Sequence, residues 1–519
     1  MSDSTITFLV LAVVVVVFVW DRLPVAVAAL GVALSLWATG VLDLEQALAG
    51  FGDPSVLFIA SLFVVSESLE ASGVTSWAGQ RLIAGAGESR TRVLVLMMLL
   101  CALLTALITP NGSVAALAPV VVVAAVRLRR SPSQLLIPLA FAAHAGSLLV
   151  LTASPVNVII SEAADDAGVG RIGFFDFALV GVPLVAGTVA IAVLFGERLL
   201  PDRTPRATTR DFSAHARTLV AQYGLAPDDV QLTRGTGVAE VVIPPRSELI
   251  GETVFPYQVT DSGDLVVLAV QRKGEDLPGD TVLAVGDTLL LEGTWGALDR
   301  HLDDPGVLVV DEPTLVRRQA VPLGEGAKRA LVVLAAMVVL LATGAVPPAV
   351  AGLLAAMAIV VAGVLTIDQA YRGIQWTTVI LVAGMIPLST AMTDTGAAAK
   401  LADGLVDTVG DAGPRVLILG LVLLTFVLGQ LISNMATALI MIPIAVSAAA
   451  DLAVSPKPVL MALAVACAAA FITPVATPAN LMVMEPGGYR FGDYWKLGLP
   501  MLLLFGLVAV LVVPVFWSF

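Results

Sequence analysis

The sequence predicts an all-α polytopic membrane protein of two inverted repeats, each with five transmembrane segments and a re-entrant hairpin, plus an inserted soluble α+β domain. The chain of 519 residues is 58% hydrophobic and only 13% charged, whereas a soluble domain carries about 25% charged residues. Many of its apolar runs approach the ~20 residues that span a bilayer. A pattern of polar interruptions also occurs twice at one constant spacing.

Each interruption is a short polar cluster between two apolar runs. The first cluster, Ile108–Ser113, has its counterpart at Leu431–Ala436, and the second, Thr152–Asn157, has its counterpart at Val475–Asn480. The offset is constant, because 434 − 111 = 323 and 480 − 157 = 323. Interrupted hydrophobic segments at corresponding positions of two halves are the best indication of a transporter's binding site that a sequence offers.

The first half, residues 1–200, is predicted to contain five spans and one hairpin. Two short apolar runs, Val93–Ile108 and Val114–Val126, flank the first cluster, and they suit a re-entrant hairpin better than two full spans. The amphipathic segment Trp77–Arg92 is expected at the membrane interface. The other apolar runs are Thr5–Trp20, Val25–Val41, Ser55–Leu69, Gln134–Val150 and Phe177–Phe195.

Residues 201–320 have the composition of a soluble domain. Charged residues return, and the hydrophobic period changes from that of a helix to that of a strand. Turn-forming pairs such as Pro244-Pro245 and Lys273-Gly274 separate the predicted strands. Those strands are Val238–Ile243, Leu265–Val270, Thr281–Val285 and Thr288–Leu291.

The second half, residues 321–519, repeats the pattern of the first. Its hairpin runs from Val416 to Ser447 and turns at the polar cluster Leu431–Ala436, and an amphipathic segment at Ala397–Val409 precedes it. The remaining apolar runs are Ala330–Ala342, Pro347–Leu365, Thr377–Met392, Val459–Ile472 and Leu497–Trp517.

Basic residues predict the orientation in a cell membrane, since Lys and Arg favour the cytoplasmic side. With the N-terminus outside, only Arg171, Lys400, Arg415 and Lys457 fall outside. The two halves are then inverted, and residues 201–320 are cytoplasmic. The basic residues placed inside are Arg22, Arg81, Arg90, Arg92, Arg127, Arg129, Arg130, Arg198, Arg329, Arg372, Arg490 and Lys496.

Composition and motifs argue against several other classes of protein. A net charge of −13 gives no reason to expect a nucleic-acid partner. Cys101 and Cys467 lie in apolar runs and are expected to be small buried hydrophobes. The three His residues have no metal-ligand spacing, and no nucleophile–base motif indicates an enzyme. His144, on an apolar face, is interpreted as a hydrogen-bonded packing residue.

The polar clusters predict binding sites for an anion and a small cation. Non-helical backbone at membrane depth is tolerated only inside protein or beside a water-filled cavity. Free N–H groups at a helix start suit an anion, whereas carbonyl, Ser, Thr and Asn oxygens suit sodium. A lone Asn or Pro is more often a packing device, but four matched breaks at one offset favour a functional role. Glu162 and Glu485, also 323 apart, have either an interfacial structural role or one in ion coupling.

Four stretches of the membrane portion carry a family resemblance. They are Phe174–Phe177, Trp376–Thr390, Ser433–Ala438 and Thr473–Asn480. With these the membrane portion resembles the divalent anion–sodium symporter family, which includes bacterial sodium–dicarboxylate and sulfate transporters. The resemblance implies a homodimer in the lipid bilayer, with a mobile part that works as an elevator.

In that family a Ser-Asn-Thr motif at each hairpin tip binds substrate and sodium. Residue-by-residue matching places Asn111 in the first tip and Ser433 and Asn434 in the second. Pro110 and Gly112 replace the Ser and Thr of the first motif, and Met435 replaces the Thr of the second. The missing hydroxyls help to hold carboxylates in dicarboxylate members, so sulfate or a related oxyanion is favoured here.

The breaks and the resemblance together define a hypothesis for the site. Sodium is expected as the coupling ion, at one site of Thr109, Asn111, Gly146 and Ala153 and at another of Ser433, Asn434, Thr437 and Ala476. The anion would lie between the two ions. Its predicted contacts are Asn111, Gly112, Ser113, Ser154, Asn157, Ser433, Asn434, Met435, Thr477 and Asn480.

The inserted domain resembles the TrkA C-terminal domain through Ala239–Ser247, Leu249–Gly251 and Asp287–Leu291. That resemblance implies pairing across a dimer and, as in some relatives, a small ligand such as a cyclic dinucleotide. The alternative is a domain that serves only dimerisation or stability.

The function expected from the sequence is sodium-coupled symport of a small anion. The alternative within transport is a sodium–dicarboxylate symporter. A ligand-gated potassium channel would also explain a cytosolic domain, but the chain lacks a Thr-Val-Gly-Tyr-Gly filter.

Overall fold

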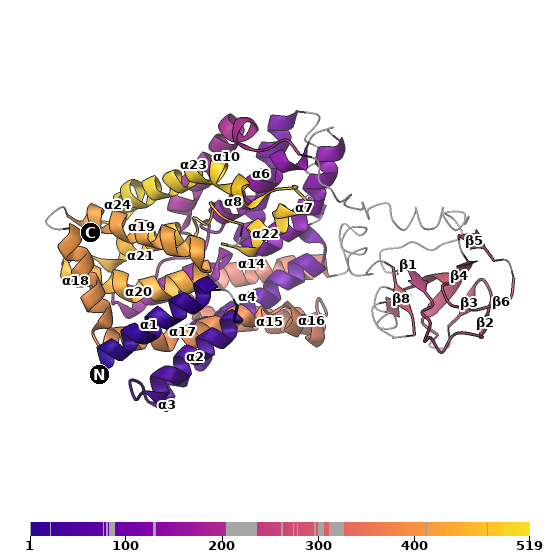
Figure 1. Cartoon of the computed structure of the whole chain (residues 1–519), viewed down its shortest axis with the longest axis horizontal. Coiled ribbons are helices and arrows are strands. Elements are labelled where there is room, and N and C mark those ends of the chain that lie inside the picture. Colours follow the sequence, from indigo (N-terminus) through magenta and orange to yellow (C-terminus); the bar gives the residue numbers. More distant parts are fainter. Residues whose placement is uncertain are drawn as a thin grey trace. The chain divides into compact units, whose positions relative to one another are not determined.

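A computed structural model shows a mostly helical chain that divides into two compact units (Figure 1). One unit consists of residues 1–69, 78–208 and 329–519, and the other of residues 70–77 and 209–328. The residues that the structure describes are 2–20, 22–75, 77–78, 81, 89–127, 131–203, 236–260, 263–272, 274–277, 279–294, 297–298, 306–310, 326–409, 413–474 and 476–519.

The helical unit contains the long apolar helices. Among the described residues, seven helices are long and apolar enough to cross a membrane. The helices of the first half are α1 (Asp3–Trp20), α2 (Val25–Ala38), α3 (Leu44–Leu48), α4 (Pro54–Ala71), α6 (Arg90–Leu107), α7 (Pro110–Arg127), α8 (Leu136–Gly146), α9 (Pro155–Asp166) and α10 (Ala178–Leu199). Most of the predicted interfacial segment Trp77–Arg92 lies outside the described residues.

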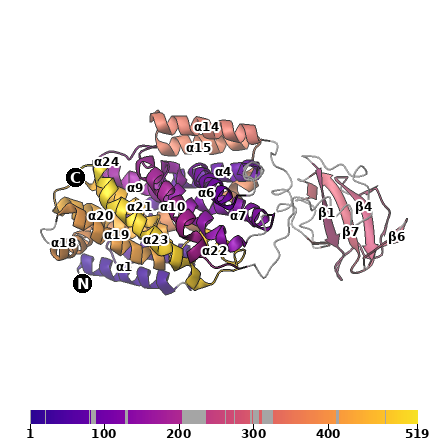
Figure 2. The same ribbon diagram turned by 90° about the horizontal axis from the view of Figure 1, so that it is seen from above.

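The second half follows the same order. Its helices are α14 (Ala327–Thr343), α15 (Pro348–Val361), α16 (Ile367–Gly373), α17 (Trp376–Asp394), α18 (Ala397–Val409), α19 (Pro414–Leu431), α20 (Asn434–Asp451), α21 (Pro456–Cys467), α22 (Pro478–Met484), α23 (Tyr494–Leu507) and α24 (Val513–Phe516). Helices α14 and α15 form a hairpin along one edge of the unit (Figure 2). A hydrogen bond of 2.8 Å from Arg329 to the carbonyl of Ala362 joins its open end.

The polar clusters interrupt helices because their residues favour helix starts. Pro110, Pro155 and Pro478 each stand at the first position of a helix, where a missing N–H costs nothing and φ is already helical. Ser433 caps α20, since its hydroxyl accepts a hydrogen bond from the N–H of Ala436 at 3.3 Å.

The hairpin helices extend beyond the short apolar runs of the sequence. Helices α6, α7, α19 and α20 each contain 18 residues, because each continues through polar residues at its ends. Helix α6 begins at Arg90, and α19 includes Gln430 near its end. An 18-residue helix is about 27 Å long, and α6 and α7 begin before the apolar runs that start at Val93 and Val114. The re-entrant path of the hairpins stays a prediction.

The second segment of each broken helix packs against the other half of the unit. Helix α9 contacts α20 and α21, and helix α22 contacts α7 and α8. These two sets of contacts correspond, because the helix starts Pro155 and Pro478 are separated by 478 − 155 = 323 residues. The four breaks therefore meet at one place in the unit.

Glycines allow the closest helix contacts. A Cβ added at Gly146 in α8 would lie 2.6 Å from the Cα and the carbonyl oxygen of Ala102 in α6. The two backbones therefore approach more closely than any side chain at position 146 would permit.

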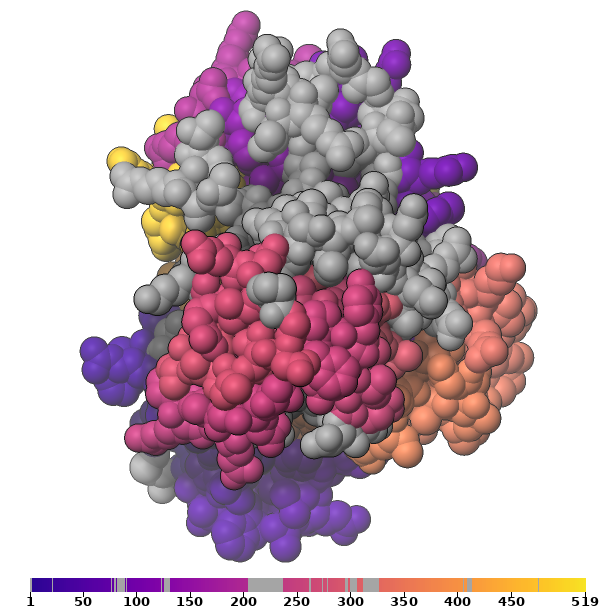
Figure 3. All heavy atoms as spheres, turned by 90° about the vertical axis from the view of Figure 1, so that its right-hand side faces the viewer, coloured from indigo at the N-terminus to yellow at the C-terminus, as the bar shows by residue number. Residues whose placement is uncertain are grey.

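The second unit contains an antiparallel sheet in the order β3-β4-β7-β1-β8, with β5 paired to β4. Its apolar core includes Val241, Val267 and Leu291, and Figure 3 shows part of its outer surface. The strands are β1 (Thr236–Val242), β2 (Thr253–Val254), β3 (Gln258–Val259), β4 (Leu265–Arg272), β5 (Glu275–Asp276), β6 (Thr281–Val282), β7 (Thr288–Thr294) and β8 (Leu308–Val309).

Candidate functional site

A cavity of about 270 Å³ lies where the four breaks meet. The structure brings nine of the predicted site residues to its wall, from both halves of the chain. They are Thr109, Asn111, Ser154, Asn157, Ser433, Asn434, Met435, Ala476 and Thr477. Residues separated by more than 300 positions in sequence therefore line one space.

Six other predicted site residues do not line this cavity. Thr437 is fully buried, and its hydroxyl donates to the carbonyl of Ser433 at 3.1 Å. The carbonyl of Gly146 already accepts from the N–H of Leu149 at 3.1 Å. The residues outside the lining are Gly112, Ser113, Gly146, Ala153, Thr437 and Asn480.

Two buried asparagines close the breaks in the same way. The amide nitrogen of Asn157 donates to the carbonyls of Ser147 at 2.7 Å and Val150 at 3.1 Å. The amide nitrogen of Asn480 donates to the carbonyls of Ala470 at 2.8 Å and Thr473 at 3.1 Å. Both pairs of acceptors lie ten and seven residues before their Asn. These amides therefore satisfy backbone carbonyls that the breaks would leave unpaired.

One oxygen at the site has no such partner. The side-chain oxygen of Asn434 is buried and accepts no hydrogen bond within the described part of the chain. A buried acceptor left unpaired costs about 1–3 kcal/mol. The oxygen lies in a cavity-lining side chain, so a bound cation or a donor group would remove that cost. Ser113, one turn into α7, has a buried hydroxyl in the same condition.

The cavity wall is mostly apolar and contains polar groups but no charged side chain among the described residues. As far as the structure describes the chain, this wall contains no Lys, Arg, Asp or Glu. Its polar groups are amides, hydroxyls and an imidazole, so the described wall offers hydrogen bonds to an ion but no opposite charge. Desolvating an unpaired ion at such a place costs several kcal/mol, which favours joint binding of opposite charges.

Several residues of the wall were not predicted from the sequence. Gln375, Thr377 and Thr378 line the cavity from the start of α17, and His144 lines it from α8. The polar run before an apolar helix at 375–378 was a usable signal. No signal in the sequence placed His144 in the wall, because its two hydrogen-bond partners lie more than 330 residues away in sequence.

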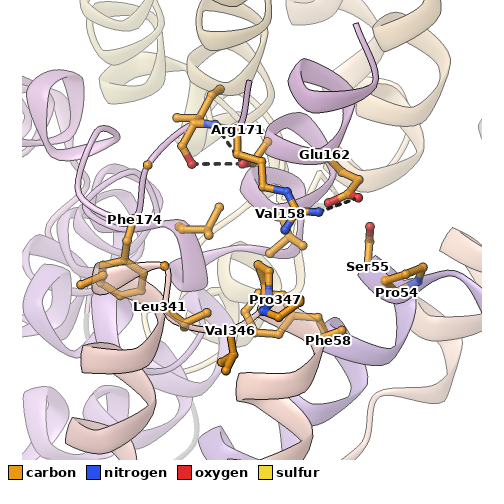
Figure 4. Close-up of a pocket in the computed structure, with 18 of the residues that line it drawn as sticks. Pro54, Ser55, Phe58, Val158, Glu162, Arg171, Phe174, Leu341, Val346 and Pro347 are labelled. Atoms are coloured by element: carbon orange, nitrogen blue, oxygen red, sulfur yellow. Dashed lines mark hydrogen bonds and ion pairs between the residues drawn. The ribbon is translucent and has the colours of Figure 1, made fainter. Parts of the chain in front are cut away.

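A second, larger cavity of about 600 Å³ lies between α4, α9 and the turn that joins α14 to α15. Figure 4 shows Arg171 reaching Glu162 across its rim. The Arg171 guanidinium lies 3.1 Å from Glu162 and 2.9 Å from Asp165. The Glu162 carboxylate is therefore ion-paired, and its role stays a prediction.

One family and several known proteins are similar to this chain. The family described as "Citrate transporter" (CitMHS) matches residues 15–466 and 412–519. "Uncharacterized transporter YfbS" of Escherichia coli is 31% identical over 98% of this chain and 98% of that protein. "Sodium/sulfate cotransporter 1" of Chlamydomonas reinhardtii is 27% identical over 51% of this chain and 31% of that protein. The structure of the Alcanivorax borkumensis YdaH transporter matches 97% of each chain, with 16% identity and a TM-score of 0.45.

Proposed function

This chain belongs to the citrate transporter family, whose matched relatives are transporters and not enzymes, and from that premise we propose a sodium-coupled symporter of a small anion. The proposed substrate is sulfate or a related oxyanion. The observation that carries the proposal is the unpaired side-chain oxygen of Asn434 in the wall of an uncharged cavity.

Sodium is the proposed partner of that oxygen. Amide and backbone oxygens are the ligands that a small hard cation prefers at broken helices. The second sodium would lie at Asn434 with Ser433 and Ala476, and the first at Asn111 with Thr109. Gly146, Ala153 and Thr437 do not line the cavity and would contribute only backbone oxygens or shape.

The anion would lie between the two cations. Hydroxyl and amide groups of Ser154, Asn157 and Thr477 line the space in which it would bind. Bound sodium supplies the positive charge that the wall lacks, so each ligand should raise the affinity for the other by the same factor.

Sulfate is favoured by the hairpin tips and by a relative. Gly112 and Met435 stand where dicarboxylate members of the resembling family have hydroxyls, and the Chlamydomonas relative is named a sodium/sulfate cotransporter. A sodium–carboxylate symporter is the second candidate, because the family's own description is that of a citrate transporter.

The remaining parts of the proposal concern architecture. We propose two inverted repeats, residues 1–200 and 321–519, in a homodimer whose mobile part moves as an elevator. Residues 201–320 would be a cytosolic domain of the TrkA C-terminal type that pairs across the dimer and tunes transport, with or without a small ligand such as a cyclic dinucleotide.

Uptake into proteoliposomes tests the function. Labelled sulfate, succinate and citrate would be supplied to the purified full chain, with and without an inward sodium gradient. Sodium-driven uptake of sulfate above that of both carboxylates is the expected result. Preferential uptake of a carboxylate would select the second candidate, and uptake indifferent to sodium would refute the coupling.

A further inference from the structure

His144 forms hydrogen bonds that join the two halves of the cavity. Its ring atom Nε2 lies 3.1 Å from Oδ1 of Asn480 and 3.2 Å from the hydroxyl of Thr477. The side chain is only 2% exposed, and it lines the cavity. The ring is fixed further by the edge of Phe471, whose centroid lies 5.7 Å away.

The hydrogen positions of this cluster follow from its acceptors. The amide nitrogen of Asn480 donates to two backbone carbonyls, which can only accept. If the amide oxygen and nitrogen of Asn480 were exchanged, the amide oxygen would lie against the carbonyl oxygens of Ala470 and Thr473. Oδ1 must therefore face His144. Since Oδ1 can only accept, Nε2 of His144 must carry a hydrogen.

The Thr477 hydroxyl is then left with a free hydrogen. Because Nε2 is protonated, Thr477 can only accept from it, and its oxygen also accepts from the N–H of Asn480 at 3.4 Å. Both lone pairs are occupied, and the described residues offer no acceptor for the hydroxyl hydrogen. Thr477 lines the cavity, so that hydrogen has the cavity to point into.

We propose that His144 is a positioning residue of this cavity: by sharing its one Nε2 hydrogen between Thr477 and Asn480 in a bifurcated hydrogen bond, it directs the Thr477 hydroxyl hydrogen toward the bound anion. With its lone pairs engaged, the Thr477 oxygen is a donor to the anion and not a sodium ligand. This inference rests on the proposed function, because it assumes that an anion occupies the cavity.

The arrangement exists in one half only. The position of the first half that corresponds to Thr477 is Ser154, because 477 − 323 = 154, and the position that corresponds to His144 is Cys467, because 144 + 323 = 467. A thiol cannot replace the strong N–H donor of imidazole. The hydroxyl of Ser154 accepts from the N–H of Val156 at 3.3 Å. The site is therefore asymmetric, with its oriented hydroxyl donor in the second half.

Transport kinetics of the reconstituted full chain test the proposal. His144→Leu should raise the KM for sulfate about tenfold, the effect of losing one hydrogen bond to a charged ligand, with little change in maximal rate. The sodium concentration for half-maximal uptake at trace sulfate should stay unchanged. His144→Gln, which retains an N–H donor, should recover most of the affinity. Cys101→Ala, at a buried position outside the cavity wall, is the control and should behave as the wild type.

A double substitution separates positioning from packing. In the Thr477→Val variant the hydroxyl is already absent. Adding His144→Leu to that variant should therefore raise its sulfate KM by a further factor of less than about two. Fully additive effects, or a His144→Leu variant that elutes as a folded protein with an unchanged KM, would overturn the inference. Wild-type protein without sodium-driven anion uptake would instead refute the proposed function itself.

Nitrogen-15 NMR of histidine provides a test that does not depend on a His144 variant. In His215→Asn/His301→Asn protein, the single remaining imidazole should show a hydrogen on Nε2, and its signals should shift when sulfate and sodium are added together. An imidazole with its hydrogen on Nδ1 alone could not donate from Nε2 to Thr477 and would overturn the inference.

Discussion

Asn434 is the residue on which the proposed chemistry depends most. Its buried oxygen has no partner among the described residues, and a substitution that removes it should not disturb the packing of α20. The prediction is that Asn434→Ala abolishes sodium-coupled uptake, while the free energy of unfolding in detergent changes by less than about 1 kcal/mol. Asn111→Ala should weaken the first sodium site in the same manner. Well-folded variants that transport with unchanged sodium dependence would show that the site is misplaced.

A second prediction at this scale concerns the sheet unit. The buried carboxylate of Asp287 accepts two bonds from Arg272, at 2.7 and 2.8 Å, and one from the N–H of Ala284 at 2.8 Å. The Arg272 guanidinium holds the pKa of Asp287 below its ordinary value. A carboxyl whose folded-state pKa is lowered stabilises the fold above its unfolded pKa, and that contribution is lost as the pH falls through the folded pKa.

Hydrogen exchange of the full chain checks this pH dependence. After correction for intrinsic rates, protection of β7 should be constant from neutral pH to about pH 5 and fall below about pH 4. Asp287→Asn should reduce protection at neutral pH and flatten the decline. A wild-type profile that stays flat to pH 3 would show that the ion pair does not stabilise this unit.

Among the helices, the close contact of α6 with α8 determines how the first break is held. Gly146→Ala would place a Cβ at 2.6 Å from the backbone of Ala102, and such overpacking costs about 1–3 kcal/mol. The thermal midpoint of the purified protein should therefore fall. Gly31→Ala in α2 is a matched control, because a Cβ there meets nothing within 4 Å. An equal midpoint for both variants would contradict the packing account.

The sequence predicted the breaks but not the cross-half contacts. The breaks could be predicted because Pro110, Pro155 and Pro478 stand among small polar residues and begin helices. Prolines with apolar neighbours, such as Pro119 in α7 and Pro443 in α20, lie inside helices instead. The role of Gln430 could not be predicted from the sequence. Its side chain forms hydrogen bonds with the carbonyl of Ala469 and the N–H of Ile472, and only the folded chain brings these residues together. The same holds for His144 and Asn480, which lie 336 residues apart in sequence.

For the whole molecule, the topology is still a prediction from basic residues. Single cysteines would be introduced as Ala167→Cys and Ser131→Cys and labelled in intact cells. The cysteine at position 167 should react from outside and the one at position 131 only after permeabilisation, since the positive-inside bias places the two positions on opposite sides. Accessibility of both positions from one side would refute the inverted arrangement.

The sheet unit gives a further prediction at this scale. Deletion of residues 211–310 should leave membrane insertion intact, because the apolar helices of the other unit do not include them. Uptake should change in rate or in its response to cyclic dinucleotides. A deleted protein with wild-type uptake under all ligand conditions would exclude a regulatory role.

The central claim is that the cavity between the breaks binds sodium and an anion together. Its most direct test is equilibrium binding of labelled sulfate to the purified full chain across a sodium titration. Sulfate affinity should rise with sodium in the wild type, with an equal rise in sodium affinity on adding sulfate, and Asn434→Ala should lose both effects. Sulfate binding that is tight without sodium, or a linkage that survives Asn434→Ala, would contradict the account.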